Sequence, residues 1–410
     1  MADKNIQICR TKRTSPQRFK IKHETIANIE GDLLRRVRAQ DGLSRIELAR
    51  SLNLAPSTVG IYVDHLIEEG FLSEGKRVGR DFGRPPTALG LNAQGGRFIG
   101  VDFEARNIMA IAVDFSQKPL KRFHDTIDQG DTVEHILEKI ERAIHEVEEG
   151  DDRRLLSIGV GVPGVIDPVR GIARQYKHIR GWSNIPLAER LSARFSVPVF
   201  LENTIRSMAL AELWFGQGRG LKNFICLGMR SGIGAGVMID GQVYHGSHNL
   251  AGEIGDWPCA LGHLDGDGPA LPTLEEIASL HGIQSFLAAS GTNAMHAELA
   301  ANFSLTRLLQ AAHEKDELIL ALLNRVAATL GLVSSQLNRA FNPSKIILAG
   351  VFPAFGSAFL GLVEENFQKF SRGQELPALV VSDIGEFSGA LGAAALAVHE
   401  WKPVTNQAEA

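Results

Sequence analysis

The sequence has no run of about 18 apolar residues, and charged residues near its N-terminus leave no apolar core of the signal-peptide kind. These absences argue against a membrane span and predict a cytoplasmic protein without a membrane partner. Cysteine is also scarce, since Cys9, Cys226 and Cys259 lie far apart with no CxxC spacing. A disulfide framework and a cysteine-rich zinc site are therefore not expected, and the thiols are predicted to be reduced.

Positive charge is scarce outside the first part of the chain. Residues 1–92 hold 16 Lys and Arg against 11 Asp and Glu, and the remainder holds 27 against 36, so the local net charges are +5 and −9. Residues 1–22 alone carry seven basic residues and one acid, which predicts a flexible basic arm. A basic segment on an acidic body favours nucleic-acid binding by the first part, and a merely solvated tail is the alternative.

Three helices are predicted after the arm. A helical apolar stripe starts at Thr25 and stops at Asp41-Gly42. Ser44, with Glu47 in capping-box spacing, starts a second helix that ends near Ser51. The third helix covers residues 56–70, with proline in its first turn and glycine at its end. The residues predicted to face inward from the second helix are Ile46, Leu48 and Ala49.

The tight second connection predicts a helix-turn-helix, and two short strands around a Gly- and Arg-bearing turn after it predict a wing, so residues 23–92 form a winged helix. No Lys or Arg lies between Pro56 and Gly70, so guanine reading by an arginine of this helix is not expected. Wing arginines suit phosphates or the minor groove, and use of the wing only for protein contacts is the alternative. The predicted DNA-binding residues are Ser57, Thr58, Ile61, Tyr62, Lys76, Arg77, Arg80 and Arg84.

Beyond Asn92 strands and helices alternate, which indicates an α/β body. Two apolar strands are predicted in residues 96–115, an amphipathic helix in 132–149, and a buried strand running into a Gly-Pro loop in 155–167. The pattern of residues 223–244 repeats that of the first hairpin, which predicts two similar lobes with a cleft between them. The predicted lobes are residues 93–215 with 383–402, and residues 216–382.

Six segments of the body, in this order, form a specific signature. They are Gly159–Gly171, Gly181-Trp182, Val197–Gly220, Ser231–Gly241, Ala251–Asp256 and Ser388–Ala397. With the N-terminal module, the chain resembles the ROK family (repressors, open reading frames and sugar kinases), in particular its winged-helix, sugar-responsive repressors. The resemblance implies an actin-like (ribonuclease H-like) two-lobe body with a sugar between the lobes, usually in a dimer.

Polar residues near the predicted strand ends suit a hydroxyl-rich ligand. The GVPG turn ending at Gly164 exposes backbone amides, although a plain tight loop has the same pattern. Asn203 both donates and accepts, as a clamp on neighbouring hydroxyls must. Glu253 lies in a Gly-flanked turn, and Glu275 matches the family's other sugar-binding Glu, so two carboxylates would accept hydrogen bonds from the sugar.

Three further cleft positions depart from the family pattern. His178 stands where the family commonly has Asn, Arg206 replaces the second Asn of the Glu-Asn-Asp-x-Asn pattern, and Asp256 replaces the zinc-binding His. Arg206 and His178 together would accept a carboxylate or phosphate on a modified sugar. The alternative is that Arg206 pairs with an acid such as Glu202, in which case an ordinary aldose remains a candidate.

The residues needed for phosphoryl transfer are missing, so no catalytic residue is predicted. Thr204 stands at the position of the kinase base Asp, and its hydroxyl has no useful basicity near neutral pH. Asp102 survives in the first phosphate loop, but Glu104 and Ala105 replace two glycines and place a negative charge where ATP phosphates would lie. Arg230 begins the second loop in place of glycine.

No zinc and no other cofactor is expected. The family's cysteine cluster is reduced to Cys259, and the His263, Asp265 and Asp267 pattern that follows is typical of a solvent loop. Without zinc, this stretch is predicted to be mobile or to become ordered only when a ligand binds.

The leading hypothesis is a sugar-responsive transcriptional regulator, most simply a repressor, that binds operator DNA at an inverted repeat. A homodimer, or a dimer of dimers, would present its recognition helices roughly 34 Å apart. The alternatives are a sugar kinase with an added DNA-binding module, and a scaffold controlled by a protein partner.

Overall fold

The computed structural model describes residues 21–75, 87–128, 130–259, 271–373 and 375–403. The predicted arm, the wing residues Lys76, Arg77, Arg80 and Arg84, and the loop from 260 to 270 lie outside the described residues. The chain divides into two compact units, one comprising Met1–Asn92 with Lys402–Ala410 and the other Ala93–Trp401.

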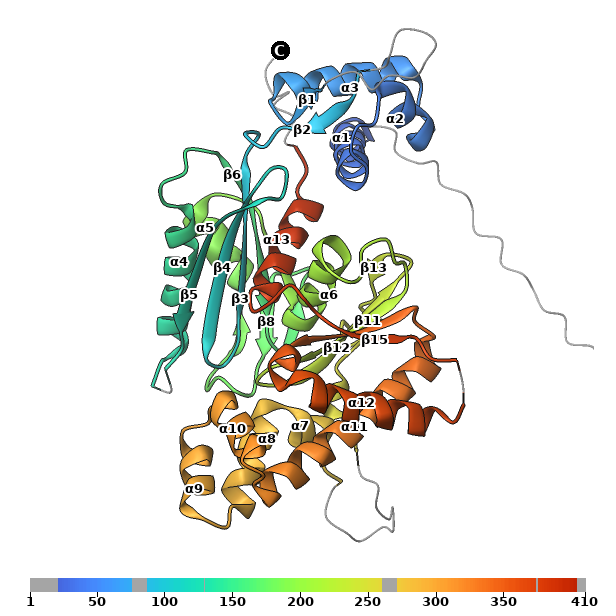
Figure 1. The fold of residues 1–410 in the computed structure, drawn as a ribbon. Helices are drawn as coiled ribbons and strands as arrows, with labels where there is room; N and C mark the ends of the chain where they lie inside the picture. The colour runs from blue at the N-terminus through green and yellow to red at the C-terminus, as the bar shows by residue number, and fades with distance from the viewer. Residues whose placement is uncertain (1–20, 76–86, 129, 260–270, 374, 404–410) are drawn as a thin grey trace, which may run out of the picture. The chain divides into compact units, whose positions relative to one another are not determined.

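The N-terminal unit is a winged helix-turn-helix (Figure 1). Its elements are α1 (Ile21–Ala39), α2 (Arg45–Leu52), α3 (Pro56–Glu68), β1 (Leu72–Glu74) and β2 (Leu89–Leu91). The two strands pair antiparallel. Helix α2 begins at the predicted capping box, where the Glu47 amide donates to Ser44 Oγ at 3.3 Å and the Ser44 amide donates to Glu47 Oε2 at 2.9 Å.

Two details of this unit differ from the sequence prediction. Helix α1 begins at Ile21, before the predicted Thr25. Ile46 does not face inward but is 53% exposed, whereas Leu48 and Ala49 are buried. Because two residues rotate by about 200° around a helix, Ile46 and Leu48 point to opposite sides. The apolar side chain of Ile46 therefore did not identify the buried face of this short helix.

The body contains two five-stranded sheets with the same topology. The strands of the first sheet, in the order in which they pair, are β10 (Val199–Asn203), β6 (Leu155–Val162), β3 (Arg97–Phe103), β4 (Asn107–Asp114) and β5 (Pro119–Thr126). The strands of the second sheet, read from its other edge, are β15 (Ala378–Val381), β14 (Lys345–Gly350), β11 (Phe224–Met229), β12 (Ile233–Ile239) and β13 (Gln242–Val243). In each, an antiparallel hairpin (β3–β4 or β11–β12) pairs through its first strand with a parallel strand (β6 or β14). The predicted repeat of the first hairpin is thus present as a repeated sheet.

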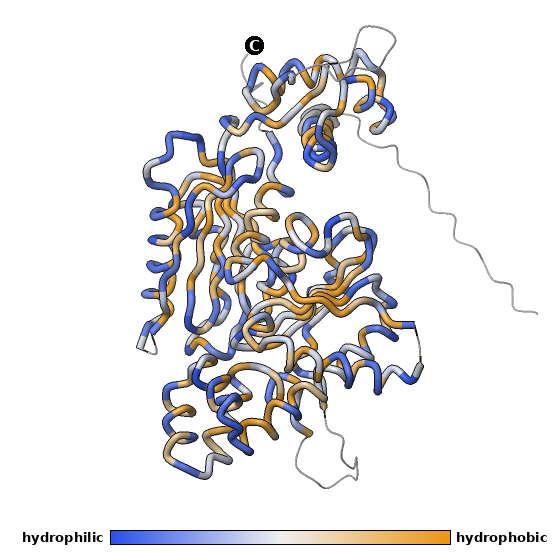
Figure 2. Tube along the Cα trace, in the orientation of Figure 1, coloured by the Kyte–Doolittle hydropathy of each residue, from blue (hydrophilic) through white to orange (hydrophobic). Residues whose placement is uncertain are grey.

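A smaller sheet consists of β7 (Val165–Asp167), β8 (Ile172–Gln175) and β9 (Ser183–Ile185). Figure 2 shows apolar residues concentrated in the strands of the two large sheets.

Helices cover both faces of each large sheet (Figure 1). The outer face of the first sheet packs against α4 (Val133–Glu148) and α5 (Leu187–Phe195), and α6 (Thr204–Phe215) and α13 (Ser388–Glu400) pack against each other between the sheets. The remaining helices belong to the second lobe. They are α7 (Leu274–Ala278), α8 (Leu280–Ser290), α9 (Ala294–Ala301), α10 (Leu305–His313), α11 (Glu317–Phe341) and α12 (Gly356–Ser371), with short 3-10 turns at Ile254–Asp256 and Phe352–Phe355.

This layering, with two related sheets separated by a central helix pair, is the actin-like arrangement. We call the part built on the first sheet the first lobe and the part built on the second sheet the second lobe; the residue limits predicted for them stay a prediction. Helix α11 alone among the described helices is long and apolar enough to cross a membrane. Its Leu330, Val333 and Leu337 are fully buried in the core of the second lobe, as expected of a core helix.

Candidate functional site

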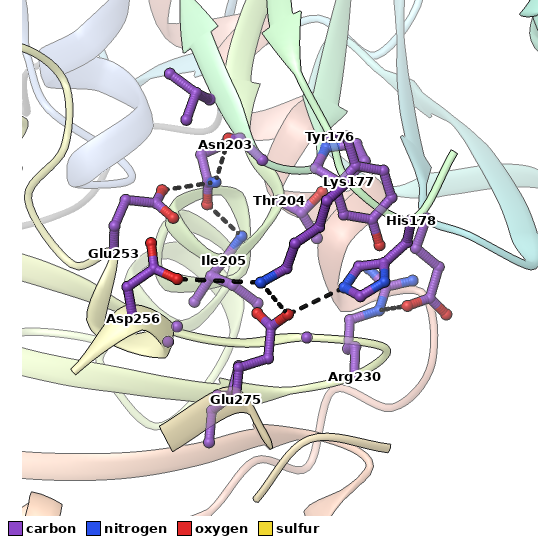
Figure 3. Close-up of a pocket in the computed structure, with 18 of the residues that line it drawn as sticks. Tyr176, Lys177, His178, Asn203, Thr204, Ile205, Arg230, Glu253, Asp256 and Glu275 are labelled. Carbon is purple, nitrogen blue, oxygen red and sulfur yellow. Dashed lines mark hydrogen bonds and ion pairs between the residues drawn. The ribbon is translucent and has the colours of Figure 1, made fainter. Parts of the chain in front are cut away.

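A cavity of about 270 Å³ lies between the strand ends of the two lobes (Figure 3). The first lobe contributes Glu104 and the segments 163–165, 175–178 and 203–205, and the second contributes Arg230 and the turns that follow its strands. The residues of the predicted ligand set that line it are Gly164, His178, Asn203, Glu253, Asp256 and Glu275. The seventh, Arg206, does not line the cavity.

Asn203 lies at the junction of β10 and α6, and both ends of its side-chain amide are hydrogen-bonded within the chain. Its Oδ1 caps α6 by accepting from the Ile205 amide at 2.8 Å and the Arg206 amide at 3.3 Å. This fixes the orientation of Nδ2, which donates to the Gly164 carbonyl at 3.1 Å and to Glu253 Oε1 at 3.2 Å. Gly164 has φ +74°, and a Cβ there would lie 2.2 Å from the Gln175 carbonyl oxygen, so the turn requires glycine.

Glu253 reaches the same cavity from the second lobe. It follows Gly252, where φ is +87° and a Cβ would lie 1.8 Å from the Ala235 carbonyl oxygen, so only glycine lets this turn pack against β12. Burial raises the pKa of Glu253 to about 7; Arg206 opposes this rise, and the charges of Asp256 and Glu275 add to it. Near pH 7 the carboxyl is therefore present in two forms: the protonated form donates a hydrogen bond, and the ionised form only accepts.

This pKa gives a prediction for stability. An acid whose pKa is raised by folding stabilises the native state fully below its unfolded pKa of about 4.3, and this stabilisation is lost as the pH rises through about 7. Glu253→Gln should remove this contribution, so chemical denaturation should show a smaller fall in the free energy of unfolding between pH 5 and pH 8 than in the parent protein. Equal pH slopes for the two proteins would contradict the raised pKa.

Lys177, His178 and Glu275 form an ion-pair cluster on one wall of the cavity (Figure 3). Glu275 Oε1 lies 2.8 Å from Lys177 Nζ and 3.0 Å from His178 Nε2. Burial works to raise the pKa of Glu275, but the hydrogen bonds from His178 and Lys177 outweigh it and lower the pKa. Lys177 was not among the residues predicted from the sequence, although it is adjacent to His178 in the loop after β8 and lines the cavity.

Arg206 was predicted to contact the ligand, but it does not line the cavity. Its guanidinium is buried, with Nε 2.7 Å from Glu202 Oε1, and its Nη1 donates to the carbonyls of Asn249 and Ala251 at 3.2 and 3.3 Å. Glu202 also lies 2.7 Å from His245 Nε2. The pairing with Glu202, the alternative left open by the sequence, is the one present, so Arg206 holds the loop before Glu253 instead of facing a ligand.

A second ion-pair cluster joins the lobes at the back of the cavity, and we call Asp102, Glu104, Arg230 and Ser231 the interlobe cluster. Glu104 Oε2 accepts from the Ser231 amide at 3.2 Å and from Ser231 Oγ at 3.0 Å, and it lies 3.4 Å from Arg230 Nε. Arg230 Nη1 also donates to Asp102, which is 0% exposed. A carboxylate of the chain itself thus occupies the turn between β11 and β12.

The charges of the interlobe cluster depend on one another. Burial raises the pKa of Asp102 although Arg230 opposes it, whereas the contacts of Glu104 with Arg230, Asn107 and Ser231 outweigh burial and lower its pKa. Arg230 remains charged, because the two carboxylates outweigh the effect of burial and raise its pKa. Thr204, at the kinase base position, is buried beside this cluster and lines the cavity.

On the N-terminal unit, α3 presents the predicted DNA-binding residues outward. Ser57 and Ile61 are exposed, Ile61 to 69%, while Thr58 and Tyr62 are half-buried. The opposite side of α3 carries Val59, Val63 and Leu66 into the core. An exposed isoleucine on the side of the helix opposite Val59, Val63 and Leu66 is suited to an apolar contact with a thymine methyl.

Within the described ranges, which omit 260–270, no group of three or more His, Cys, Asp or Glu side chains is arranged to hold a metal ion. His263, Asp265 and Asp267 lie in the omitted loop, and the prediction of no zinc stays a prediction.

Comparison with known proteins agrees with this architecture. Residues 98–400 match the ROK family model, and residues 27–73 match a winged helix-turn-helix DNA-binding model. The chain is 28% identical over 342 residues to the xylose repressor of Caldicellulosiruptor bescii, covering 79% of this chain and 83% of the relative. It is 29% identical over 317 residues to a glucokinase of Thermotoga maritima, covering 73% of this chain and 96% of the relative.

A solved ROK family transcriptional regulator, described as a homologue of the Escherichia coli MLC protein, has the same fold. It superposes with a TM-score of 0.74 at 24% identity, covering 92% of this chain and 97% of the other. The match over residues 98–400, together with this fold, shows that the chain belongs to the ROK family.

Proposed function

We propose that this protein is a transcriptional repressor whose affinity for operator DNA changes when a sugar or sugar derivative binds in the interlobe cavity. One observation carries the proposal: the cavity keeps sugar-type donors and acceptors, while the chain's own Glu104 occupies the turn where a kinase would hold phosphate. The winged helix on the same chain and the similarity to a xylose repressor support DNA as the partner.

The loss of kinase chemistry is part of the proposal. Phosphoryl transfer needs a base on the attacking hydroxyl and donors free to receive phosphate oxygens. Thr204 supplies no base, and the Ser231 amide and hydroxyl are already used by Glu104. A nucleotide phosphate in that turn would have to displace a carboxylate and approach a negative charge. The similarity to a glucokinase, 29% identity over 73% of this chain, does not by itself supply these groups.

Regulation would follow from the position of the cavity between the lobes. A ligand that contacts Asn203 on the first lobe and Glu253 on the second binds one lobe arrangement better than another, and only this difference in affinity can shift the equilibrium. In a homodimer, a change in lobe arrangement would alter the spacing of the two recognition helices, which must match half-sites roughly 34 Å apart.

The experiment that tests this proposal is thermal melting of the full-length protein with unphosphorylated, phosphorylated and acidic sugars, and with ATP-Mg alone. We expect at least one sugar to raise the melting temperature and ATP-Mg to leave it unchanged, because a ligand stabilises only a state that it binds. The stabilising sugar should also change the affinity for operator DNA in a fluorescence titration. Stabilisation by ATP-Mg with sugar turnover would instead identify a kinase.

A further inference from the structure

The basic side chains of the cavity wall already have carboxylate partners. Lys177 pairs with Glu275 at 2.8 Å, and His178 contacts the same oxygen at 3.0 Å. Arg230 is held between Asp102 and Glu104. Arg206, the remaining cation considered for an acidic ligand, is buried against Glu202 outside the cavity. An anionic ligand group would therefore have to break an existing ion pair to obtain a cationic partner.

The carboxylates of the cavity are in excess. Glu104, Glu253, Asp256 and Glu275 all line it, against the fixed cations Lys177 and Arg230. Asp256 is 84% exposed at the mouth of the cavity, and its nearest cation, Lys177, is 4.0 Å away. Among the described side chains, only the neutral amide of Asn203 is hydrogen-bonded to Glu253. Within the described part of the chain no ion pair involves Glu253, and the one cation near Asp256, Lys177, is already paired more closely with Glu275. Both acids face the space that a ligand enters (Figure 3).

We infer that the effector carries neither a phosphate nor a carboxylate: it is a neutral sugar or an amino sugar, and the acids at the cavity mouth reject anionic forms of the same sugar. This inference rests on the proposed sugar site and narrows its ligand class. Sugar hydroxyls donate readily to Glu253 and Glu275, and an ammonium group would add charge-assisted hydrogen bonds to Glu253 and Asp256. An anion placed there finds no unpaired cation among the described lining residues and meets the negative charge of Asp256 and of the ionised form of Glu253.

The test is isothermal titration of the full-length protein with matched sugars. The probes are D-glucose, D-xylose, N-acetyl-D-glucosamine and D-glucosamine. Each is compared with the same sugar phosphorylated at its terminal carbon, and D-glucuronate serves as the acidic form of glucose. We expect the best unphosphorylated binder to have a dissociation constant at least tenfold lower than its phosphate, and no measurable binding of glucuronate. A phosphate or acid that binds as tightly as its neutral counterpart overturns the inference and leaves the proposed sugar site standing.

Failure of the sugar site itself would look different, since no member of either series would bind. The operator titration, which does not depend on the cavity, would then report separately on the DNA-binding part of the proposed function.

A variant tests whether the cavity charge is responsible. Asp256→Lys changes an exposed side chain, so folding should be unaffected, and we expect it to narrow the affinity gap between a sugar and its phosphate at least tenfold. Glu386→Lys is the matched control, because it makes the same charge change at an exposed residue that does not line the cavity. If Asp256→Lys leaves the ratio at the parent value, or if both variants change it equally, the charge of the cavity mouth does not select the ligand.

Discussion

Replacing Arg230 with methionine is expected to lower the free energy of unfolding by about 3–5 kcal/mol, the range for removing one partner of a buried ion pair. The substitution leaves Asp102, which is fully buried, and Glu104 without the guanidinium that pairs with both. Without Arg230 the pKa of each carboxyl should rise, so the loss should be greatest at neutral pH and decrease in acid, where both groups bind protons. Chemical denaturation at pH 5 and pH 8 measures both effects.

The matched control for this prediction is Arg307→Met in the same lobe. Arg307 lies 3.0 Å from Glu298 in a pair whose two side chains are both exposed, so the loss of this pair should change stability little. Asp102→Asn combined with Arg230→Met should recover part of the stability, because the double variant removes one of the stranded charges. A single variant at Arg230 that is as stable as the Arg307 variant would show that the interlobe cluster does not hold the lobes together.

Replacing Ile61 with glutamate is expected to weaken operator binding about 100-fold without changing the melting temperature. The loss of an apolar base contact costs roughly 1–3 kcal/mol, and a negative charge in the groove adds repulsion from the phosphates. Because Ile61 is 69% exposed, its replacement removes little packing from the N-terminal unit. A fluorescence anisotropy titration at fixed salt concentration measures the affinity, and a thermal melt of each variant checks the fold.

Val169→Glu is the control for the recognition helix. Val169 is 92% exposed in the body, so this variant adds the same charge to the same protein without touching α3. We expect it to bind operator like the parent. Equal affinities for the Ile61 and Val169 variants would contradict the assignment of α3 as the helix that reads DNA.

The parts of the fold that local patterns determine could be predicted from the sequence. The Ser44 and Glu47 capping box acts over three residues, and it starts α2 where predicted. The repeated strand pattern predicted two similar lobes, and the structure contains two five-stranded sheets of the same topology, since each hairpin is a local structure. The inward orientation predicted for Ile46 was wrong, because an eight-residue helix offers too few apolar positions to fix the buried face.

The charges of the site could not be predicted in the same way, because their partners come from distant parts of the chain. Lys177 pairs with Glu275, 98 residues away, and only the folded lobes bring them together. Arg206 and Glu202 are a local pair on the sequence, but their burial, which decides between pairing and ligand contact, depends on the loop at Asn249 and Ala251. The residue types were enough to predict a ligand site, but the partner of each charged side chain could be identified only from the tertiary structure.

The interlobe cluster also affects how readily such a chain could evolve kinase activity. Under the proposed function, regaining phosphoryl transfer would need an acid at position 204, a glycine in place of Glu104 and release of Arg230 from Asp102. Changing Arg230 first strands two carboxylates, and changing Glu104 first leaves its donors unsatisfied, so single steps back pass through less stable proteins. Mutations at the exposed cavity mouth meet no such barrier. We therefore expect lineages with this cluster to change their effector more readily than to become kinases again.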